Sequence, residues 1–215
     1  NNTNSKWYPG DVEESASGIQ KAIFGFGKTS NSGSTNITNL VSSSGVVATD
    51  TTGVGTARDG LAASGYGEDK AIFGYGSTGS GYTNATNLVS NLGVVASDTT
   101  GVGTARQRLA AARYGGDKAI FGFGWNEAYY NSTDFNITNL VSNAGVVASD
   151  TTGVGTARLR LAAASYGGDK ALFGFGSNNS AALTNVTNLV SNTGVVASDT
   201  TGVGTAREIL AAAGY

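Results

Sequence analysis

One segment of about fifty residues occurs four times in this chain of 215 residues, and this repetition restricts the fold more than any other feature. The string Lys-Ala-Ile-Phe-Gly-Phe-Gly, with small variations, begins at residues that are 49, 48 and 52 positions apart, namely Lys21, Lys70, Lys118 and Lys170. Repeats of this length form one small unit each, and the unit buries its apolar face by packing on its neighbours. We therefore predict one domain over 21–215, with repeats near 21–69, 70–117, 118–169 and 170–215.

Three kinds of segment with strand character recur in each repeat. In residues 118–124, Phe121 and Phe123 alternate with Gly122 and Gly124, and a period of two is typical of a β-strand. The Thr-Asn-Leu-Val-Ser and Gly-Val-Val-Ala-Ser segments that follow are short, β-branched and bounded by Asn, Ser and Gly, so they predict two further strands.

The Leu-Ala-Ala-Ala segment, for example residues 161–164, could form one turn of helix by propensity alone. A strand is favoured, because helices shorter than about twelve residues gain little from propensity and because a Tyr-Gly-Gly turn follows. Four short strands per repeat, with turns between them, predict an all-β fold, a β-propeller of four-stranded antiparallel blades. The small alanines suit the crowded innermost strand, which makes this segment strand one of each blade.

The two ends of the chain leave two alternatives open. In the first, residues 210–213 supply the missing inner strand of the first blade and close a ring of four. In the second, residues 15–19 are a degenerate inner strand, and the C-terminal segment opens a fifth blade that continues in further sequence or in another subunit. Residues 1–20 lie outside the repeat and are predicted to be an N-terminal arm or linker. The chain contains no Met, even at position 1, and we expect a processed product or a fragment.

Neither cysteine nor histidine occurs in the sequence. Their absence excludes disulfides, thiolate nucleophiles, Ser-His-Asp triads and imidazole-bound zinc. The few glutamates occupy non-equivalent places in the repeats, so no pair of carboxylates stands out for glycoside hydrolysis. We predict a protein that is not an enzyme and that uses no cofactor and no metal.

The net charge of −2 is carried by scattered residues, without the clustered basic face of a nucleic-acid-binding protein. No apolar run approaches the roughly 18–20 residues of a membrane span. We therefore predict neither a nucleic-acid partner nor membrane insertion.

Every repeat carries an aspartate and, eight positions later, an arginine, at the two ends of the string Asp-Thr-Thr-Gly-Val-Gly-Thr-Ala-Arg. The aspartates are Asp50, Asp98, Asp150 and Asp199, and the arginines are Arg58, Arg106, Arg158 and Arg207. These charges could form a ligand site in each blade. We favour a structural role, in which the aspartate caps a turn and the planar guanidinium reaches carbonyls or carboxylates between neighbouring blades.

An Asn-x-Thr sequence, the acceptor pattern for N-glycosylation, also recurs in one register, at Asn36, Asn84, Asn136 and Asn185. A structural use of these side chains at the edge of the strand is an equally good explanation.

The segments between the second and third strands differ completely among the repeats and cover residues 28–35, 77–83, 125–135 and 177–184. In a propeller these loops emerge on the same face as the connectors between blades, and ligand-binding loops vary on a constant scaffold. Trp125, Asn126, Tyr129 and Tyr130 of the longest loop, with Tyr82 of the preceding one, are the candidate binding residues, because aromatic faces beside amides hold sugars and protein partners. Alternatively, the long loop covers the core or packs on another subunit.

Residues 156–158, 161–164, 166–168 and 171–176 together resemble the Kelch repeat, in which an arginine, a small-residue inner strand, a glycine turn and an apolar strand ending in glycine follow one another. This sequence has Gly-Phe-Gly where the Kelch repeat has adjacent glycines, and it lacks the later Tyr and Trp. The Thr-Asn-Leu-Val-Ser-Asn and Gly-Val-Val-Ala-Ser-Asp-Thr-Thr-Gly-Val-Gly-Thr-Ala-Arg strings also resemble repeats in fibre-like or virion surface proteins of marine bacteriophages and other viruses.

These resemblances imply a binding scaffold on a virion surface or outside the cell, such as a tail-fibre or decoration module for adhesion or assembly. The implied partners are proteins of a larger assembly, including further copies of the chain, or cell-surface glycans. The alternative function is a carbohydrate-binding lectin with one site in each blade.

Overall fold

The computed structural model describes residues 21–29, 33–128 and 131–215, and every regular element in this part of the chain is a β-strand. The all-β prediction is therefore confirmed. The N-terminal arm and the degenerate strand predicted within residues 1–20 lie outside the described residues.

Counted from its alanine-rich strand rather than from its lysine, each of the second, third and fourth repeats forms a three-stranded antiparallel sheet. Repeats are counted in this way from here on, so the segment from residue 210 stands where a fifth would begin. The sheet of the second repeat consists of β5 (Ala62–Tyr66), β6 (Lys70–Gly74) and β7 (Thr86–Val89). The sheet of the third consists of β8 (Ala110–Tyr114), β9 (Lys118–Gly122) and β12 (Thr138–Val141). The sheet of the fourth consists of β13 (Ala162–Tyr166), β14 (Lys170–Gly174) and β15 (Thr187–Val190). The register is the same each time, and Phe73, Phe121 and Phe173 lie opposite Asn87, Asn139 and Asn188. The Leu-Ala-Ala-Ala segments of these repeats are strands, as predicted.

The first repeat has two of these strands, β1 (Ala22–Gly25) and β4 (Thr38–Val41). Two hairpins are added between the second and third strands of a repeat, β2 (Lys28–Thr29) with β3 (Gly33–Ser34), and β10 (Trp125–Ala128) with β11 (Asn131–Asp134).

The predicted fourth strand is present as an extended segment with two isolated bridges rather than as a full strand. In the second repeat these bridges join Val89 to Val95 and Thr86 to Thr99, and the other repeats have the same pair. The turn that precedes this segment is held by the hydroxyl of Ser90, which accepts a hydrogen bond from the Val94 amide at 3.1 Å. The second, third and fourth repeats thus each contribute four antiparallel segments, of which the last is the least regular, and the described part of the first repeat contributes three.

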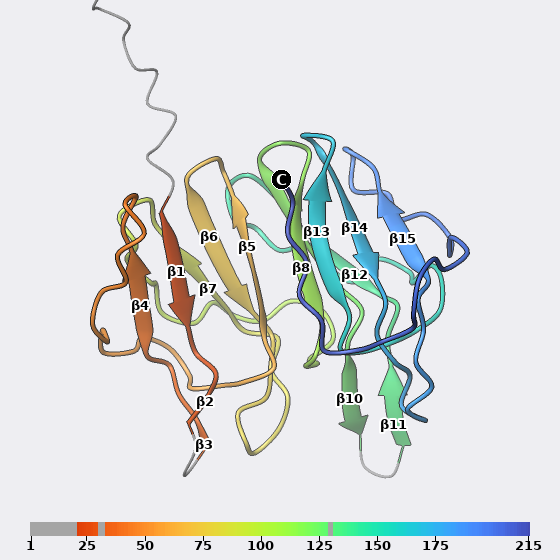
Figure 1. The fold of residues 1–215 in the computed structure, drawn as a ribbon. Helices are drawn as coiled ribbons and strands as arrows, with labels where there is room; N and C mark the ends of the chain where they lie inside the picture. Colours follow the sequence, from red (N-terminus) through yellow and green to blue (C-terminus); the bar gives the residue numbers. More distant parts are fainter. Residues whose placement is uncertain (1–20, 30–32, 129–130) are drawn as a thin grey trace, which may run out of the picture.

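Equivalent residues of neighbouring repeats are joined by the same backbone hydrogen bond each time, and we call this repeated contact the inter-repeat step. The Arg108 amide donates to the Gly60 carbonyl, the Arg160 amide to the Arg108 carbonyl, and the Ile209 amide to the Arg160 carbonyl, at 2.7, 2.9 and 2.9 Å. All four residues have a positive φ of 54–63°. The alanine-rich strands β5, β8 and β13 consequently lie next to one another in the middle of the array (Figure 1).

The C-terminal segment continues this step beyond β13. A Cβ atom on Gly214 would lie 2.5 Å from the Ser165 carbonyl oxygen, so the segment runs along β13 (Figure 1). Among the described residues β1 pairs with β4 alone. The predicted closure, in which residues 210–213 pair with β1, is therefore not confirmed, and the segment occupies the place that the inner strand of a fifth repeat would take.

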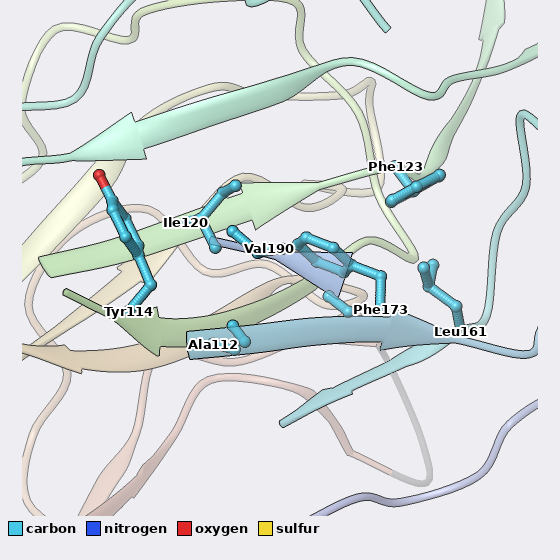
Figure 2. Close-up of a cluster of buried hydrophobic side chains, with 9 residues drawn as sticks. Ala112, Tyr114, Ile120, Phe123, Leu161, Phe173 and Val190 are labelled. Carbon is cyan, nitrogen blue, oxygen red and sulfur yellow. The ribbon is translucent and has the colours of Figure 1, made fainter. Parts of the chain in front are cut away.

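The core lies between the sheets of neighbouring repeats. In the cluster of Figure 2, Phe173 of the fourth repeat packs against Phe123 of the third, with ring centroids 5.1 Å apart, and Ile120 and Val190 complete the contact. A Cβ atom on Gly122 would lie 2.6 Å from the Phe173 ring. Glycine alternates with phenylalanine in this strand because the phenylalanine of the next repeat needs that space.

We predict that Gly122→Ala lowers the free energy of unfolding by about 1–3 kcal/mol, the usual cost of overpacking a filled core. The matched control is Gly81→Ala, because a Cβ atom at Gly81 would have no neighbour within 4 Å; this change should stay within about 0.5 kcal/mol. Urea unfolding curves measure both values, and equal stability of the two variants would contradict the packing described here.

Candidate functional site

The residues that are identical in all four repeats meet between the repeats, and we call each meeting point a junction. In the junction between the second and third repeats, the fully buried Arg106 donates from Nε to the Phe123 carbonyl at 2.7 Å and from Nη2 to Asn139 Oδ1 at 2.8 Å. Its guanidinium lies 4.3 Å from the centre of the Tyr75 ring. Arg58 and Arg158 make the same contacts. One side chain thus joins two repeats.

The aspartate of each junction binds the connector of the preceding repeat. Asp150 accepts hydrogen bonds from the Thr104 amide and hydroxyl and from Asn139 Nδ2, whereas Arg106 approaches it only to 4.0 Å. The asparagine therefore lies between the two charges and binds both. The Asp and Arg that stand eight positions apart in the sequence belong to different junctions, since Arg58 is nearest to Asp98 and Arg158 to Asp199.

Electrostatics within the junctions reflect burial and hydrogen bonding. Burial lowers the pKa of Arg58 and of Arg158 to about 10, and the neighbouring carboxylate of Asp98 or Asp199 opposes this shift. Both arginines stay charged at neutral pH. Burial also acts to raise the pKa of Asp98, Asp150 and Asp199, but the hydrogen bonds from threonine and asparagine outweigh it, and the net pKa lies below the ordinary value. The polar groups of the junctions are thus used within the protein.

The asparagines of the Asn-x-Thr pattern also hold the connectors in place. Nδ2 of Asn84 donates to the Gly103 carbonyl at 2.5 Å, and Asn36, Asn136 and Asn185 make the equivalent bond. Nδ2 is the atom to which a glycan would be attached. The structure therefore gives these side chains a structural use.

The variable loops between the second and third strands share one edge of the array, which we call the loop edge. The β2–β3 and β10–β11 hairpins both project from it in Figure 1. The connectors reach the same edge, because Ser34 donates to Asp59 Oδ1 at 2.7 Å and Trp125 exchanges two backbone hydrogen bonds with Gln107. Four different loop sequences are thus presented on one scaffold.

Three of the candidate binding residues lie within the described part of the loop edge, and Tyr129 and Tyr130 lie outside it. The rings of Tyr82 and Trp125 meet edge to face with centroids 5.7 Å apart, which joins the loops of two repeats. Asn126 donates to the Ala105 carbonyl at 3.0 Å and anchors the hairpin to the connector. The structure thus brings Tyr82 and Trp125 together and uses the Asn126 amide internally.

Arginine 108 was not among the residues that the sequence singled out, yet its guanidinium lies 5.1 Å from the centre of the Trp125 ring. It sits in the constant inter-repeat step, at a position that is Gly60, Arg160 or Ile209 in the other repeats. This variability directly after the invariant Thr-Ala-Arg was the signal available in the sequence. A shallow hollow of about 310 Å³ lies between Arg108, Arg160 and Leu210.

At the base of the longest hairpin, two buried polar atoms have no hydrogen-bond partner among the described residues, namely Trp125 Nε1 and Asp134 Oδ1. The two residues face each other in the β10–β11 register. Burial raises the pKa of Asp134, although the Asn179 amide donates to its other oxygen at 2.6 Å. The hairpin base therefore combines an indole donor, a carboxylate acceptor and aromatic faces. Within the described ranges, no group of three carboxylates could hold a metal ion.

No protein-family model matches the chain, and no curated protein matches its sequence. The resemblances to Kelch repeats and to viral fibre proteins accordingly stay predictions. In the part of the chain that the structure covers, no helix has the length and apolar character needed to cross a membrane.

We predict that Arg106→Lys lowers the free energy of unfolding by at least about 1.5–3 kcal/mol, the value of one hydrogen bond to a charged group, because lysine cannot replace the branched guanidinium. The matched control is Arg207→Lys, because Arg207 is exposed and donates only to the Thr205 carbonyl among the described residues. Measured by urea unfolding in dilute solution, the control should change by less than about 0.5 kcal/mol. Equal effects would show that the junction contacts do not stabilise the chain.

The lowered pKa values of the junction aspartates predict that the folded protein loses stability at acidic pH. Their pKa in the folded protein lies below the unfolded value of about 3.9, so their contribution is complete above about pH 5 and is lost as the pH falls through the folded pKa. Urea midpoints should therefore be flat near neutral pH and decrease below about pH 4. Asp150→Asn should be less stable at neutral pH and should lose less on acidification; an unchanged acid profile would refute this assignment.

Proposed function

We propose that this protein is a non-enzymatic structural and adhesion module whose repeats are blades of a Kelch-like β-propeller and whose loop edge binds a partner on a surface. The proposed place of action is a virion surface or the outside of a cell. The supporting observation is that invariant and variable residues lie in different places. The invariant side chains bind one another in the junctions, and the variable loops lie on one edge of the array.

The binding surface that we propose is centred on Trp125. This residue offers an aromatic ring beside Tyr82 and Arg108, and its buried indole donor has no partner in the part of the chain that the structure describes. Amphipathic aromatic side chains bind sugars and protein surfaces because they combine apolar area with a polar handle. Cell-surface glycans and proteins of a larger assembly are the partner classes that fit.

A glycan array probed with the chain and with the double variant Tyr82→Ala/Trp125→Ala tests this proposal. Truncation of a central aromatic residue costs about 2 kcal/mol or more, so the double variant should bind at least roughly thirtyfold more weakly. Val146→Ser is the matched control, since Val146 is exposed in a turn between the third and fourth segments, away from the loop edge.

The outcomes separate the two candidate functions. One site per chain, lost in the double variant and kept in the control, supports adhesion through the loop edge. A stoichiometry near four sites per chain that is insensitive to the double variant would instead favour a lectin with a site in each repeat. A silent array would reject glycan adhesion and leave the aromatic cluster as a packing surface between the loops.

A further inference from the structure

We infer that the two ends of the array bind each other between copies of this chain, so that the tail of one copy forms a complete junction with the head of the next. The tail is the surface formed by Phe175, Leu189, Val203, Thr205, Arg207 and residues 210–215. The head is the surface formed by β1, Asn39, Gly45 and Asp50. This inference concerns the array ends and not the loop edge, so it can succeed or fail separately from the proposed function.

The tail presents half of a junction. Arg207 is exposed, with its guanidinium 4.2 Å from the centre of the Phe175 ring and Nη1 donating to the Thr205 carbonyl at 3.1 Å. In the internal junctions, Nε and Nη2 bind the next repeat; for Arg207 these two donors have no such partner within the described residues. The same end is open at Val203, whose exposure is 84% against 36% for the equivalent Val154.

The head presents the other half of a junction in a ready-made form. Asn39 Nδ2 donates to Asp50 Oδ1 at 2.8 Å and to the Ala48 carbonyl at 3.2 Å. Asn87 holds Asp98 in the same way in the second repeat. In the described residues, however, no arginine and no threonine of a preceding repeat reaches Asn39 and Asp50. The head lacks a guanidinium and a hydroxyl, and the tail has both.

The aromatic residues of the tail and the head are complementary, as the polar residues are. In each internal junction a phenylalanine of one repeat packs on an aromatic ring of the repeat before it, with centroids 5.1–5.2 Å apart, in the pairs Phe73 with Phe26, Phe121 with Tyr75, and Phe173 with Phe123. Phe24 is the equivalent residue of the first repeat and is 62% exposed, against 4% for Phe73. Phe175 is the equivalent ring at the tail. Phe24 and Phe175 are each one half of such a pair.

A contact between a leucine of one repeat and a glycine of the next also supports the binding of a tail to a head. Leu88 and Leu140 pack against Gly145 and Gly194 of the following repeats. At the tail, the equivalent Leu189 is 43% exposed, and at the head, a Cβ atom on the equivalent Gly45 would have no neighbour within 4 Å. Placing the head of a second copy after the tail would cover both.

The unpaired strands also complement each other. The first repeat lacks, among the described residues, the alanine-rich strand that lies beside β6, β9 and β14 in the other repeats. Residues 210–215 have the sequence of such a strand, in register with 61–66, but form no strand within their own chain. Added to β1 of the next copy in the observed register, Ala211 would face Gly25 and Ala212 would face Phe24. Main-chain pairing of this kind is a common mode of association.

Such a contact is heterologous, because it joins two different surfaces of the same chain, and it therefore builds rings or open chains of copies rather than a two-fold dimer. This property permits a sharp experiment. Phe24→Asp blocks the head and leaves the tail intact, whereas Arg207→Glu blocks the tail and leaves the head intact. Each side chain is exposed in the single chain, so neither change should disturb its fold.

We expect light scattering to give the wild-type chain a mass above 21.5 kDa that increases with concentration or reaches one closed size. Each variant alone should be a monomer of 21.5 kDa, and an equimolar mixture of the two should form a dimer of twice that mass, since one free tail meets one free head. Val146→Asp, an exposed apolar-to-acidic change away from both ends, should keep the wild-type mass, and so should Trp125→Ala.

A wild-type chain that stays monomeric over the whole concentration range would overturn the inference. Variants that still assemble alone, or a mixture that stays monomeric, would overturn it as well. Circular dichroism establishes that each variant is folded; if Phe24→Asp were not, Asp50→Lys would block the head instead, with the same expectation for the mixture.

Discussion

The buried guanidinium of each junction is the interaction on which the array depends. Removing a charge from water is costly unless its donors are satisfied, and Arg106 is satisfied only when the Phe123 carbonyl and Asn139 of the next repeat are in place. This requirement fixes how one repeat sits on the next. It also explains why the connector ends in arginine, because lysine cannot serve several acceptors in one plane.

The same junctions explain where the chain is free to vary. A residue change in a junction would disturb two repeats at once, whereas a change in a loop such as that around Tyr82 affects contacts at the loop edge alone. Glycine is constrained in a similar way, since Gly122 leaves room for Phe173 of the neighbouring repeat. A constant scaffold with one variable edge follows from these contacts and is a suitable basis for display and binding.

Within the described residues, the first and the last repeat each carry half of a junction. Repeat proteins commonly protect such ends with capping units that have a polar outer face. The described residues at the two ends of this array include Phe24 and Arg207, a ring and a charge of the types that meet inside the array. The complementarity of these ends is thus a consequence of repetition, and it is the basis on which we propose a further copy of the chain as their partner.

The sequence by itself determined the all-β class and three of the four predicted strands of a repeat, in their order, because the period of two, the turn glycines and the fourfold repetition are local signals. It also pointed to Trp125 and to a structural role for the invariant charges. It indicated neither the two added hairpins nor the irregularity of the fourth segment. Only the tertiary structure decided that Asn139 stands between Arg106 and Asp150, that Arg108 stacks on Trp125, and that residues 210–215 lie beside β13 and not on β1. These facts depend on which repeat packs on which, and because all four repeats have nearly the same sequence, no local pattern distinguishes one neighbour from another.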